Sequence, residues 1–215
     1  GAPDILLAAC PDKDRFLPQV EEYSARGCRV LLLAMYDGQL DDEELTAGML
    51  PIALILLSNK IRPEAKATFA YFAAQGVQTK VISGDNPLTV SEVARRAGIE
   101  GAENYVDART LQTENQLAQA AERCTVFGRV TPDQKKQLVQ AMKAAGHTVA
   151  MTGDGVNDVL ALREADCSIA MASGSSVACQ ASHIVLLDSD FSAMPSVVAE
   201  GRRVINNIER SASLY

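Results

Sequence analysis

A strand, a glycine turn and a helix follow one another after His147, and this order of elements limits the possible fold more than any other stretch. The apolar residues up to Met151 are typical of a short buried strand. Gly153-Asp154-Gly155 forms the turn, and Asp158 stands at the start of a helix-like segment. Such a loop lies at the carboxyl edge of a parallel sheet, where open α/β folds bind their ligands.

The acidic residues of this loop suggest a cation and a phosphate as ligands. Asp154 and Asp158 are four residues apart, and their carboxylates suit a hard divalent cation that prefers oxygen. A helix N-terminus with free N–H groups suits phosphate. The loop by itself is equally compatible with an ordinary strand–turn–helix connection whose acids are solvated, so both interpretations stay open at this point.

Composition narrows the class of protein. The chain has 215 residues, of which 47% are hydrophobic, enough for one large domain or one domain with a small appendage. A net charge of −7 argues against a nucleic-acid-binding surface. The five cysteines form no CxxC pair, which indicates reduced residues in a cytosolic environment. The longest apolar run, at 49–57, is less than half as long as the roughly 20 residues of a membrane-spanning helix.

The chain is expected to divide into two domains. Residues 1–48 resemble the end of a small α+β domain, with a helix at 13–25 and a strand at 29–35. In residues 49–215, apolar strands alternate with helices, beginning with a strand at 52–57. This alternation predicts an α/β fold with a Rossmann-like, mostly parallel sheet and helices on both faces.

The remaining elements are expected from apolar runs, glycine stops and helix-start signals such as Thr131-Pro132. Strands are expected at 78–82, 105–106, 124–127, 147–151, 167–171 and 183–187, and helices at 42–47, 63–75, 88–97, 115–121, 132–145 and 193–215.

Three of the expected loops carry polar groups that could act together. Ser83-Gly84-Asp85 offers a hydroxyl, a glycine for close approach and an acid, and Lys135 lies in the first turn of a helix. With Asp154, Asn157 and Asp158 they would form a phosphoryl-transfer pocket, in which a lysine and a cation neutralise phosphate charge. Ser83 could equally be a turn residue, and Lys135 a solvated helix lysine.

Five stretches resemble the sequence motifs of one protein family. Thr152–Asp158 matches the TGDGxND signature at every fixed position, and Ser83-Gly84-Asp85 resembles the TGD motif with Ser in place of Thr. Val126–Lys135 resembles the segment with the motif lysine, Gly1-Ala2-Pro3 the end of a KGAP motif, and Arg29 a nucleotide-contacting arginine. The chain therefore resembles the phosphorylation domain of P-type cation-transporting ATPases, in the haloacid-dehalogenase-like superfamily, preceded by the end of the nucleotide-binding domain.

This resemblance implies roles for the residues of the phosphate site. Asp154 would be a Mg²⁺ ligand and Asp158 would support it closely at the metal. Ser83 and Asn157 would contact the phosphoryl group, and Lys135 would stabilise its charge.

The resemblance also implies a site for ATP. Arg29 would contact the nucleotide, and Gly84 and Asp85 would lie beside it. Arg62 matches the arginine of a DPxR-like element, although Asn59 replaces the acid of that element, which weakens the expected ribose contact at this position.

The family's nucleophilic aspartate, in a DKTGT motif, is absent from this sequence. Asp188 follows an apolar strand but comes after the other motifs, and the residue two before Asp37 is Met35, which is no nucleophile. A covalent acyl phosphate would therefore need an upstream segment. Two alternatives remain: a free-standing phosphatase of the same superfamily with an unrecognised nucleophile, and a non-catalytic nucleotide-binding module.

The amphipathic, locally basic segment 201–215 resembles the stalk helix that leads into the membrane in this family. The expected parent is an integral membrane protein that uses Mg²⁺ and ATP to move a cation, with this chain at the cytoplasmic face. Its expected partners are ATP, the upstream DKTGT segment and the parent's membrane helices, with no nucleic acid; the isolated chain is expected to be soluble and inactive.

Overall fold

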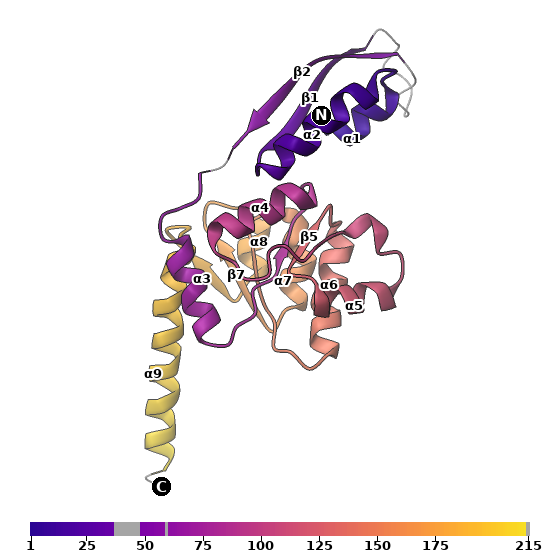
Figure 1. Ribbon diagram of the computed structural model, residues 1–215. Coiled ribbons are helices and arrows are strands. Elements are labelled where there is room, and N and C mark those ends of the chain that lie inside the picture. Colours follow the sequence, from indigo (N-terminus) through magenta and orange to yellow (C-terminus); the bar gives the residue numbers. More distant parts are fainter. Residues whose placement is uncertain (37–47, 59, 214–215) are drawn as a thin grey trace.

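A computed structural model describes residues 1–36, 48–58 and 60–213 (Figure 1). The N-terminal unit contains a two-stranded antiparallel sheet of β1 (Arg29–Tyr36) and β2 (Met49–Leu57). Helices α1 (Pro3–Leu6) and α2 (Lys13–Ala25) pack against one face of this sheet, with the short helix η1 (Leu7–Ala9) between them. Alternate β1 residues fill the core of this unit, because successive strand side chains point to opposite faces.

The strand expected at 52–57 is present, but its expected place in the parallel sheet is wrong. It begins at Met49 and pairs antiparallel with β1, with Arg29 opposite Leu57. An apolar run shows that a strand is buried or paired, but it does not identify the partner strand. The two-domain division stays a prediction, and we place its boundary after Leu57 in place of residue 48.

Beyond β2, the described residues contain six parallel strands, in two sheets of three. The first sheet has the order β3-β5-β4 and the second has the order β6-β7-β8. Their bounds are β3 (Val81–Ile82), β4 (Tyr105–Asp107), β5 (Val126–Gly128), β6 (Ala150–Gly153), β7 (Cys167–Met171) and β8 (Ile184–Leu186). The α/β class and the parallel direction are confirmed, and the single expected sheet is divided into two.

The central and edge strands differ in burial. In β5, Val126 and Phe127 are 0% and 1% exposed. In the edge strand β3, Val81 and Ile82 are only half-buried, and Ala150 at the start of the edge strand β6 is exposed. The strands that carry the predicted phosphate-site loops therefore lie at sheet edges.

Helices cover the parallel strands and connect them (Figure 1). They are α3 (Ala65–Ala74), α4 (Pro87–Ala97), α5 (Glu114–Arg123), α6 (Pro132–Ala144), α7 (Val159–Glu164), α8 (Ser176–Ala181) and α9 (Met194–Ala212), with short helices η2 (Ala108–Thr110), η3 (Val156–Asp158) and η4 (Phe191–Ala193). The residues of α6 enter two hydrophobic clusters, because Leu138 packs with α5 and β5 while Val139 packs with β6, α7 and α8. Helix α6 thus links the two sheets.

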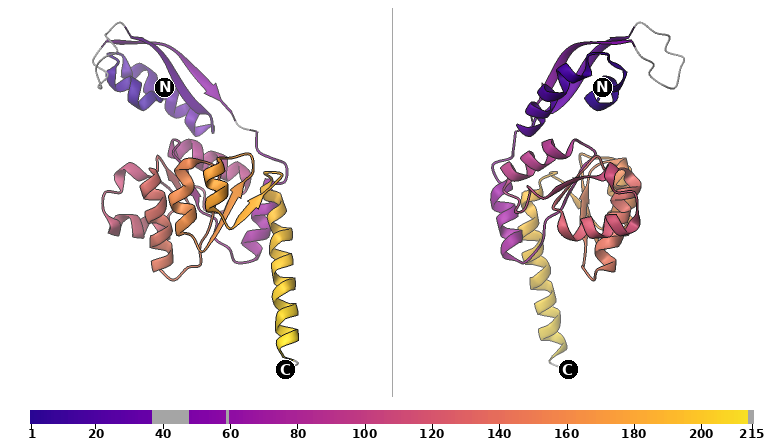
Figure 2. Two further views of the ribbon diagram at one scale, coloured as in Figure 1. Left: turned by 180° about the vertical axis from the view of Figure 1, so that it is seen from behind. Right: turned by 45° about the vertical axis from the view of Figure 1, so that its right-hand side comes forward.

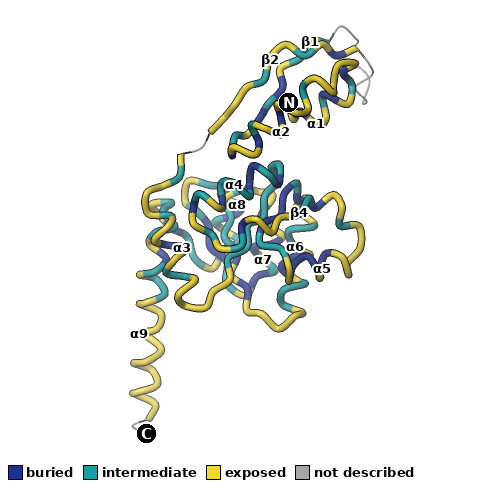
Figure 3. Tube along the Cα trace, in the orientation of Figure 1, coloured by how far each residue is buried: buried dark blue, intermediate teal, exposed yellow. Residues whose placement is uncertain are grey.

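Most of α9 projects beyond the other elements. Figure 2 shows the N-terminal unit at one end of the molecule and α9 extending from the other. Val204, Ile205 and Ile208 are 47%, 57% and 62% exposed, and the distal half of the helix is exposed all round (Figure 3). Across the described residues, no helix combines the length and apolar character that a membrane span requires. The helix predicted at 42–47, Asp37, Asn59 and the last two residues of the chain lie outside the described residues.

Candidate phosphate and cation site

A buried ion pair joins two of the predicted site residues. Lys135 Nζ lies 2.6 Å from Asp158 Oδ1, and the two side chains are only 12% and 11% exposed. The other carboxylate oxygen, Asp158 Oδ2, accepts the N–H of Gly155 at 3.1 Å. Both oxygens of Asp158 are therefore occupied by protein donors, which fixes the turn between β6 and α7.

Asp154 has the opposite environment. Its side chain is exposed, and its carboxylate makes no hydrogen bond or ion pair with any of the residues that the structure describes. Gly153 makes the tight turn possible, because a Cβ there would lie 2.6 Å from Asp158 Cβ. An exposed carboxylate without a protein donor suits a hard cation such as Mg²⁺. Asp154 therefore fits as one ligand, and no group of three acidic, histidine or cysteine residues in the described part forms a full ligand set.

The Ser83 turn lies at the carboxyl end of β3. Ser83 donates its N–H to the carbonyl of Phe127 at 2.9 Å, and its own carbonyl accepts the N–H of Val130 at 3.0 Å. The hydroxyl of Ser83 accepts the N–H of Asp85 at 3.1 Å. Gly84 has no side chain, and a Cβ there would approach only a Val130 carbonyl, at 3.9 Å. Ser83 thus closes the turn and still has a hydroxyl hydrogen to donate.

Helix α6 brings the Ser83 turn and the Lys135–Asp158 pair into one structural unit. The helix follows Val130, which is bonded to Ser83, and begins with a capping box between Thr131 and Gln134. Lys135 lies one residue after that box, in the first turn, where it reaches Asp158 in η3, just after β6 of the second sheet. The predicted association of these loops therefore depends on where α6 starts, and the start signal was readable in the sequence.

The predicted nucleotide residues lie partly together. Arg29 Nε is 3.5 Å from Asp85 Oδ1, with side chains 60% and 40% exposed. Arg29 belongs to the N-terminal unit and Asp85 to the part of the chain with the parallel strands. A second contact between these two parts is the hydrogen bond that Thr89 Oγ1 donates to the carbonyl of Cys28 at 3.1 Å. The exposed ion pair contributes little to stability, so its interest is positional: the arginine of the N-terminal unit lies at the edge of the Ser83 turn.

Arg62 lies apart from these residues. It donates to the carbonyl of Ser189 at 3.3 Å and lies 3.7 Å from Asp190 Oδ1, beside the loop that follows β8. Within the described part of the chain, no hydrogen bond or ion pair links Arg62 to Asp85 or Arg29. The structure thus does not bring Arg62 to the other predicted nucleotide residues.

Asn157, a predicted phosphate-site residue, is exposed on η3 and lies beside Asp158.

Arg129 is a neighbour of the site that the sequence did not single out. It has a positive φ of 54°, rare for a residue with a side chain, and its N–H donates to the Asp85 carbonyl at 2.8 Å. Its guanidinium bonds Asp107 at 2.7 Å and lies 3.1 Å from Asp4 of the N-terminal unit. The unusual backbone cannot be read from sequence, although the residue lies within the motif-lysine segment.

Asp107 and Asp4 share two arginines. Arg109 lies 2.9 Å from Asp107 and 3.2 Å from Asp4. Burial raises the pKa of Asp107, but hydrogen bonds from Arg109 and Arg129 outweigh burial and lower that pKa to about 2. This network of four residues connects the N-terminal unit to the parallel-strand unit beside the Asp85 turn.

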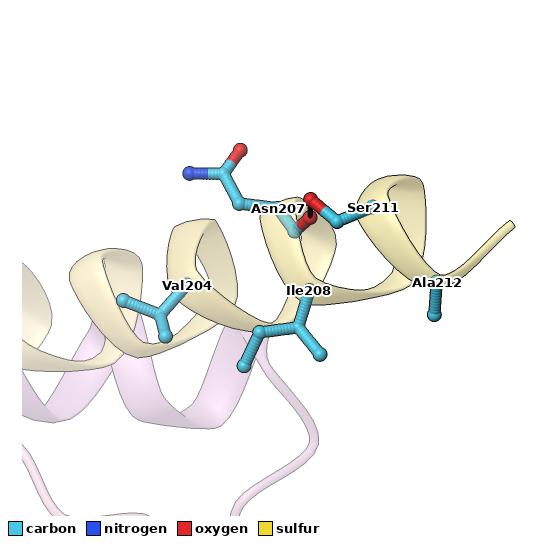
Figure 4. A pocket seen from close by; sticks show the side chains of 5 residues that line it. All are labelled: Val204, Asn207, Ile208, Ser211 and Ala212. Carbon is cyan, nitrogen blue, oxygen red and sulfur yellow. Dashed lines mark hydrogen bonds between the residues drawn. The ribbon is translucent and has the colours of Figure 1, made fainter. Parts of the chain in front are cut away.

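Two hollows lie away from all these residues. One is a shallow, open patch on α9, where Val204, Ile208 and Ala212 lie along one side of the helix (Figure 4). The other, of about 480 Å³, lies near Lys80 and Glu122 at the opposite ends of the strands from the Ser83 turn. Neither hollow contains a predicted phosphate-site residue.

Comparison with known proteins decides the family. A model of haloacid dehalogenase-like hydrolases matches residues 5–166. The chain belongs to this family. Within the haloacid dehalogenase-like hydrolases it is similar over its whole length to cation-transporting ATPases of the P-type, as the motifs predicted.

Three relatives illustrate this similarity. The calcium-transporting ATPase CtpE of Mycolicibacterium smegmatis is 49% identical over 217 residues, which cover 100% of this chain and 27% of the relative. CtpE of Mycobacterium bovis is 50% identical over 216 residues, 100% of this chain and 26% of the relative. A probable cation-transporting ATPase, exp7, of Streptococcus pneumoniae is 46% identical over 217 residues, 100% of this chain and 27% of the relative. The chain thus spans about a quarter of the length of these relatives.

Proposed function

We propose that this haloacid dehalogenase-like chain supplies the magnesium and phosphate site of an ATP-driven, cation-transporting P-type ATPase. In the parent protein an aspartate outside this chain would attack the γ-phosphorus of ATP. The bond between that phosphorus and the β–γ bridging oxygen would break, releasing ADP and leaving an aspartyl phosphate. Water would then attack the phosphorus, returning the carboxylate and inorganic phosphate.

The observation that carries this proposal is the contrast between the two acids of the β6 loop. Asp158 is buried and fully engaged by Lys135 and Gly155, whereas the Asp154 carboxylate is exposed and without a protein donor. Asp154 is therefore the residue available to a cation, and Asp158 holds the loop and the lysine in place. Mg²⁺, when bound there, would offset the negative charge of the transferred phosphoryl group.

The other residues of the site have complementary roles in this proposal. Lys135 lies in the first turn of α6 with its ammonium at the β6 loop, close enough to offset phosphate charge in both steps. The Ser83 hydroxyl and the Asn157 amide would donate hydrogen bonds to phosphoryl oxygens. Gly84 allows a close backbone approach, and Asp85, paired with Arg29, would border the nucleotide.

The two edge strands support a place for the missing nucleophile segment. Val81 and Ser83 donate their N–H groups to residues next to or within β5, so the backbone groups of Ile82 between them point away from β5. We propose that a parallel strand from the upstream segment pairs with β3 on one side and with β6 on the other. Neighbouring strands are about 4.8 Å apart, so the end of such a strand would lie beside both Ser83 and Asp154.

The free-standing phosphatase is the weaker candidate. Its nucleophile would be Asp188, which follows β8, and β7 separates β8 from β6. That spacing puts the ends of β8 and β6 about 10 Å apart, too far for one phosphoryl group to touch both aspartates directly. A non-catalytic nucleotide-binding module would not require the buried Lys135–Asp158 pair beside a free carboxylate.

The parent's cargo and location are part of the proposal. The relatives that are 49–50% identical are named calcium-transporting ATPases, so Ca²⁺ is the first cation to test. The exposed apolar stripe of α9 suits a helix that continues toward the parent's membrane helices, with this chain on the cytoplasmic side. Arg62 lies apart from Asp85 and pairs with Asp190 in the loop after β8. We therefore propose that Arg62 stabilises the fold and does not contact the nucleotide.

The test begins with Mg²⁺-dependent hydrolysis of p-nitrophenyl phosphate by this chain and by Asp154→Asn. Equal, background rates are expected because the nucleophile is outside the chain. The upstream DKTGT segment is then co-expressed, and phosphate incorporation from γ-labelled ATP is measured. Incorporation that requires Asp154 supports the proposal, whereas hydrolysis by the chain alone that disappears in Asp154→Asn and Asp188→Asn would establish the phosphatase instead.

A further inference from the structure

The loop between β7 and α8 lies directly against the backbone of Asp154. A Cβ built on Gly174 would lie 2.4 Å from the Asp154 carbonyl oxygen, 2.9 Å from its Cα and 3.0 Å from its carbonyl carbon. All three are backbone atoms, so no side-chain rotation could relieve the contact. Only glycine fits at position 174 while Asp154 stays where it is.

The next residue holds the same carbonyl by a hydrogen bond. Ser175 donates its N–H to the Asp154 oxygen at 2.7 Å, while its own hydroxyl accepts the N–H of Val177. The loop is fixed in turn by the N–H of Gly174, which donates to the carbonyl of Met171 at the end of β7 at 2.9 Å. The backbone of Asp154 is therefore held from β7, the neighbouring strand, as well as from its own.

We propose that Gly174 and the Ser175 N–H are positioning elements for the divalent cation, because they set the direction in which Asp154 presents its carboxylate. This inference rests on the proposed role of Asp154 as the Mg²⁺ ligand. The Asp154 side chain has no partner among the described side chains to orient it. Its direction is consequently set by its backbone, and that backbone is held by Gly174 and Ser175.

The size of the expected effect follows from the contact distances. Ordinary contacts of a Cβ begin near 3.4 Å, so an alanine at position 174 requires a relative displacement of about 1 Å from the present 2.4 Å. Mg²⁺ demands near-ideal octahedral geometry at short metal–oxygen distances. Groups that orient metal ligands typically change metal affinity by about 10- to 100-fold when they are altered. A loss of at least about tenfold in Mg²⁺ affinity is therefore expected for Gly174→Ala.

The experiment is a MgCl₂ titration of the isotopically labelled chain bound to the co-expressed upstream segment, which completes the site, followed by amide NMR shifts of residues 153–158 of this chain. Asp154→Asn tests the proposed ligand. Gly174→Ala tests the steric contact, and Gly201→Ala is its matched control, because a Cβ at Gly201 in α9 meets nothing within 4 Å. A serine-derived α-hydroxy acid at position 175 removes the N–H without adding an atom, and Ser175→Ala keeps that N–H while removing the hydroxyl.

The proposal expects saturable shifts in the unmodified chain, no binding by Asp154→Asn, and affinity weakened at least about tenfold by Gly174→Ala and at least about threefold by the α-hydroxy acid. Gly201→Ala and Ser175→Ala should bind as the unmodified chain does. Urea unfolding of each variant separates this effect from loss of the fold, and the α-hydroxy acid variant decides the matter if Gly174→Ala does not fold.

Two negative outcomes have different meanings. If the unmodified chain shows no saturable shifts, or if Asp154→Asn binds Mg²⁺ as well as the unmodified chain, the Mg²⁺ role of Asp154 in the proposed function is wrong. The positioning role is then lost with it. If Asp154→Asn abolishes binding while Gly174→Ala and the α-hydroxy acid bind normally, Asp154 is the ligand and the positioning role alone is overturned. Equal weakening by Ser175→Ala and Gly174→Ala would also overturn it, because the hydroxyl would then be responsible.

Discussion

Replacing Lys135 by methionine would remove one partner of the most buried ion pair that the structure describes. Methionine keeps the apolar stem of lysine, so the main change is the loss of the charge that lies 2.6 Å from Asp158. Asp158 would retain only the 3.1 Å bond from the Gly155 N–H. An almost buried carboxylate would then have lost its counter-ion.

The expected cost is about 3 kcal/mol in the free energy of unfolding. Removing one partner of a buried pair costs about 3–5 kcal/mol, and the lower end applies because the two side chains keep 12% and 11% of their exposure. With a urea dependence of about 2 kcal/mol per molar, the unfolding midpoint would fall by about 1.5 M. Asp158→Asn combined with Lys135→Met should cost less than the two single changes added, because the unpaired charge is gone.

Urea unfolding at pH 7, monitored by circular dichroism, measures these changes. Lys136→Met is the matched control, since its neighbouring ammonium makes no ion pair with the described residues, and it should change stability by less than about 0.5 kcal/mol. A Lys135→Met midpoint within error of the Lys136→Met midpoint would refute the reasoning. Strict additivity in the double variant would refute it as well.

Three further predictions follow from other contacts. The folded-state pKa of Asp107, about 2, lies below its usual 3.8, so its stabilisation is present above about pH 4 and is lost as the pH falls toward 2. Asp107→Asn should therefore cost up to about 2 kcal/mol in urea unfolding at pH 7 and clearly less at pH 3. Thr131→Ala removes the α6 cap and should cost about 1 kcal/mol, and Thr131→Ser should restore most of it. Ile208→Ser on exposed α9 should cost less than about 0.5 kcal/mol and so lower the melting temperature by less than about 2 °C.

Local signals predicted most of the elements. The helix expected at 13–25 has those bounds, and the Thr131-Pro132 start signal correctly placed the beginning of α6. The strands at 78–82 and 147–151 were shifted or shortened to Val81–Ile82 and Ala150–Gly153. An apolar run can be longer than the segment that pairs with a neighbouring strand. The run then overestimates the length of the strand.

Partner choice was harder to predict than the elements. The run at 52–57 was correctly read as a strand, yet it pairs with β1. Strand pairing depends on long-range contacts and on the path of the intervening chain, neither of which appears in a local window. Similarly, the positive φ of Arg129 and the approach of Gly174 to Asp154 are properties of the folded backbone, and glycine or arginine in a sequence is compatible with many conformations.

The placement of the candidate residues was predictable to the extent that it follows from the fold. Lys135 was expected in the first turn of a helix, and its contact with Asp158 follows from the start of α6. The joint action of Ser83 and Asp154 stays a prediction. The bonding of the two acids did not follow from the residues themselves, although the family resemblance gave Asp154 the ligand role and Asp158 the supporting one. Asp154 and Asp158 are chemically identical in the sequence, and only the Lys135 and Gly155 contacts distinguish the bonded carboxylate from the exposed one.

The divided sheet and the incomplete site have one explanation under the proposed function. Strands β3 and β6 are edge strands in which all residues except Met151 are half-buried or exposed, and each leads into one half of the candidate site. A single strand paired with both would cover those residues. It would also form hydrogen bonds with the backbone N–H and C=O of Ile82, which face away from β5. Its end would place a carboxylate between Ser83 and Asp154. Stability and chemistry would then be gained in the same step. The upstream segment should accordingly raise the unfolding free energy of this chain even when its aspartate is replaced by asparagine, while phosphate incorporation should require the aspartate itself.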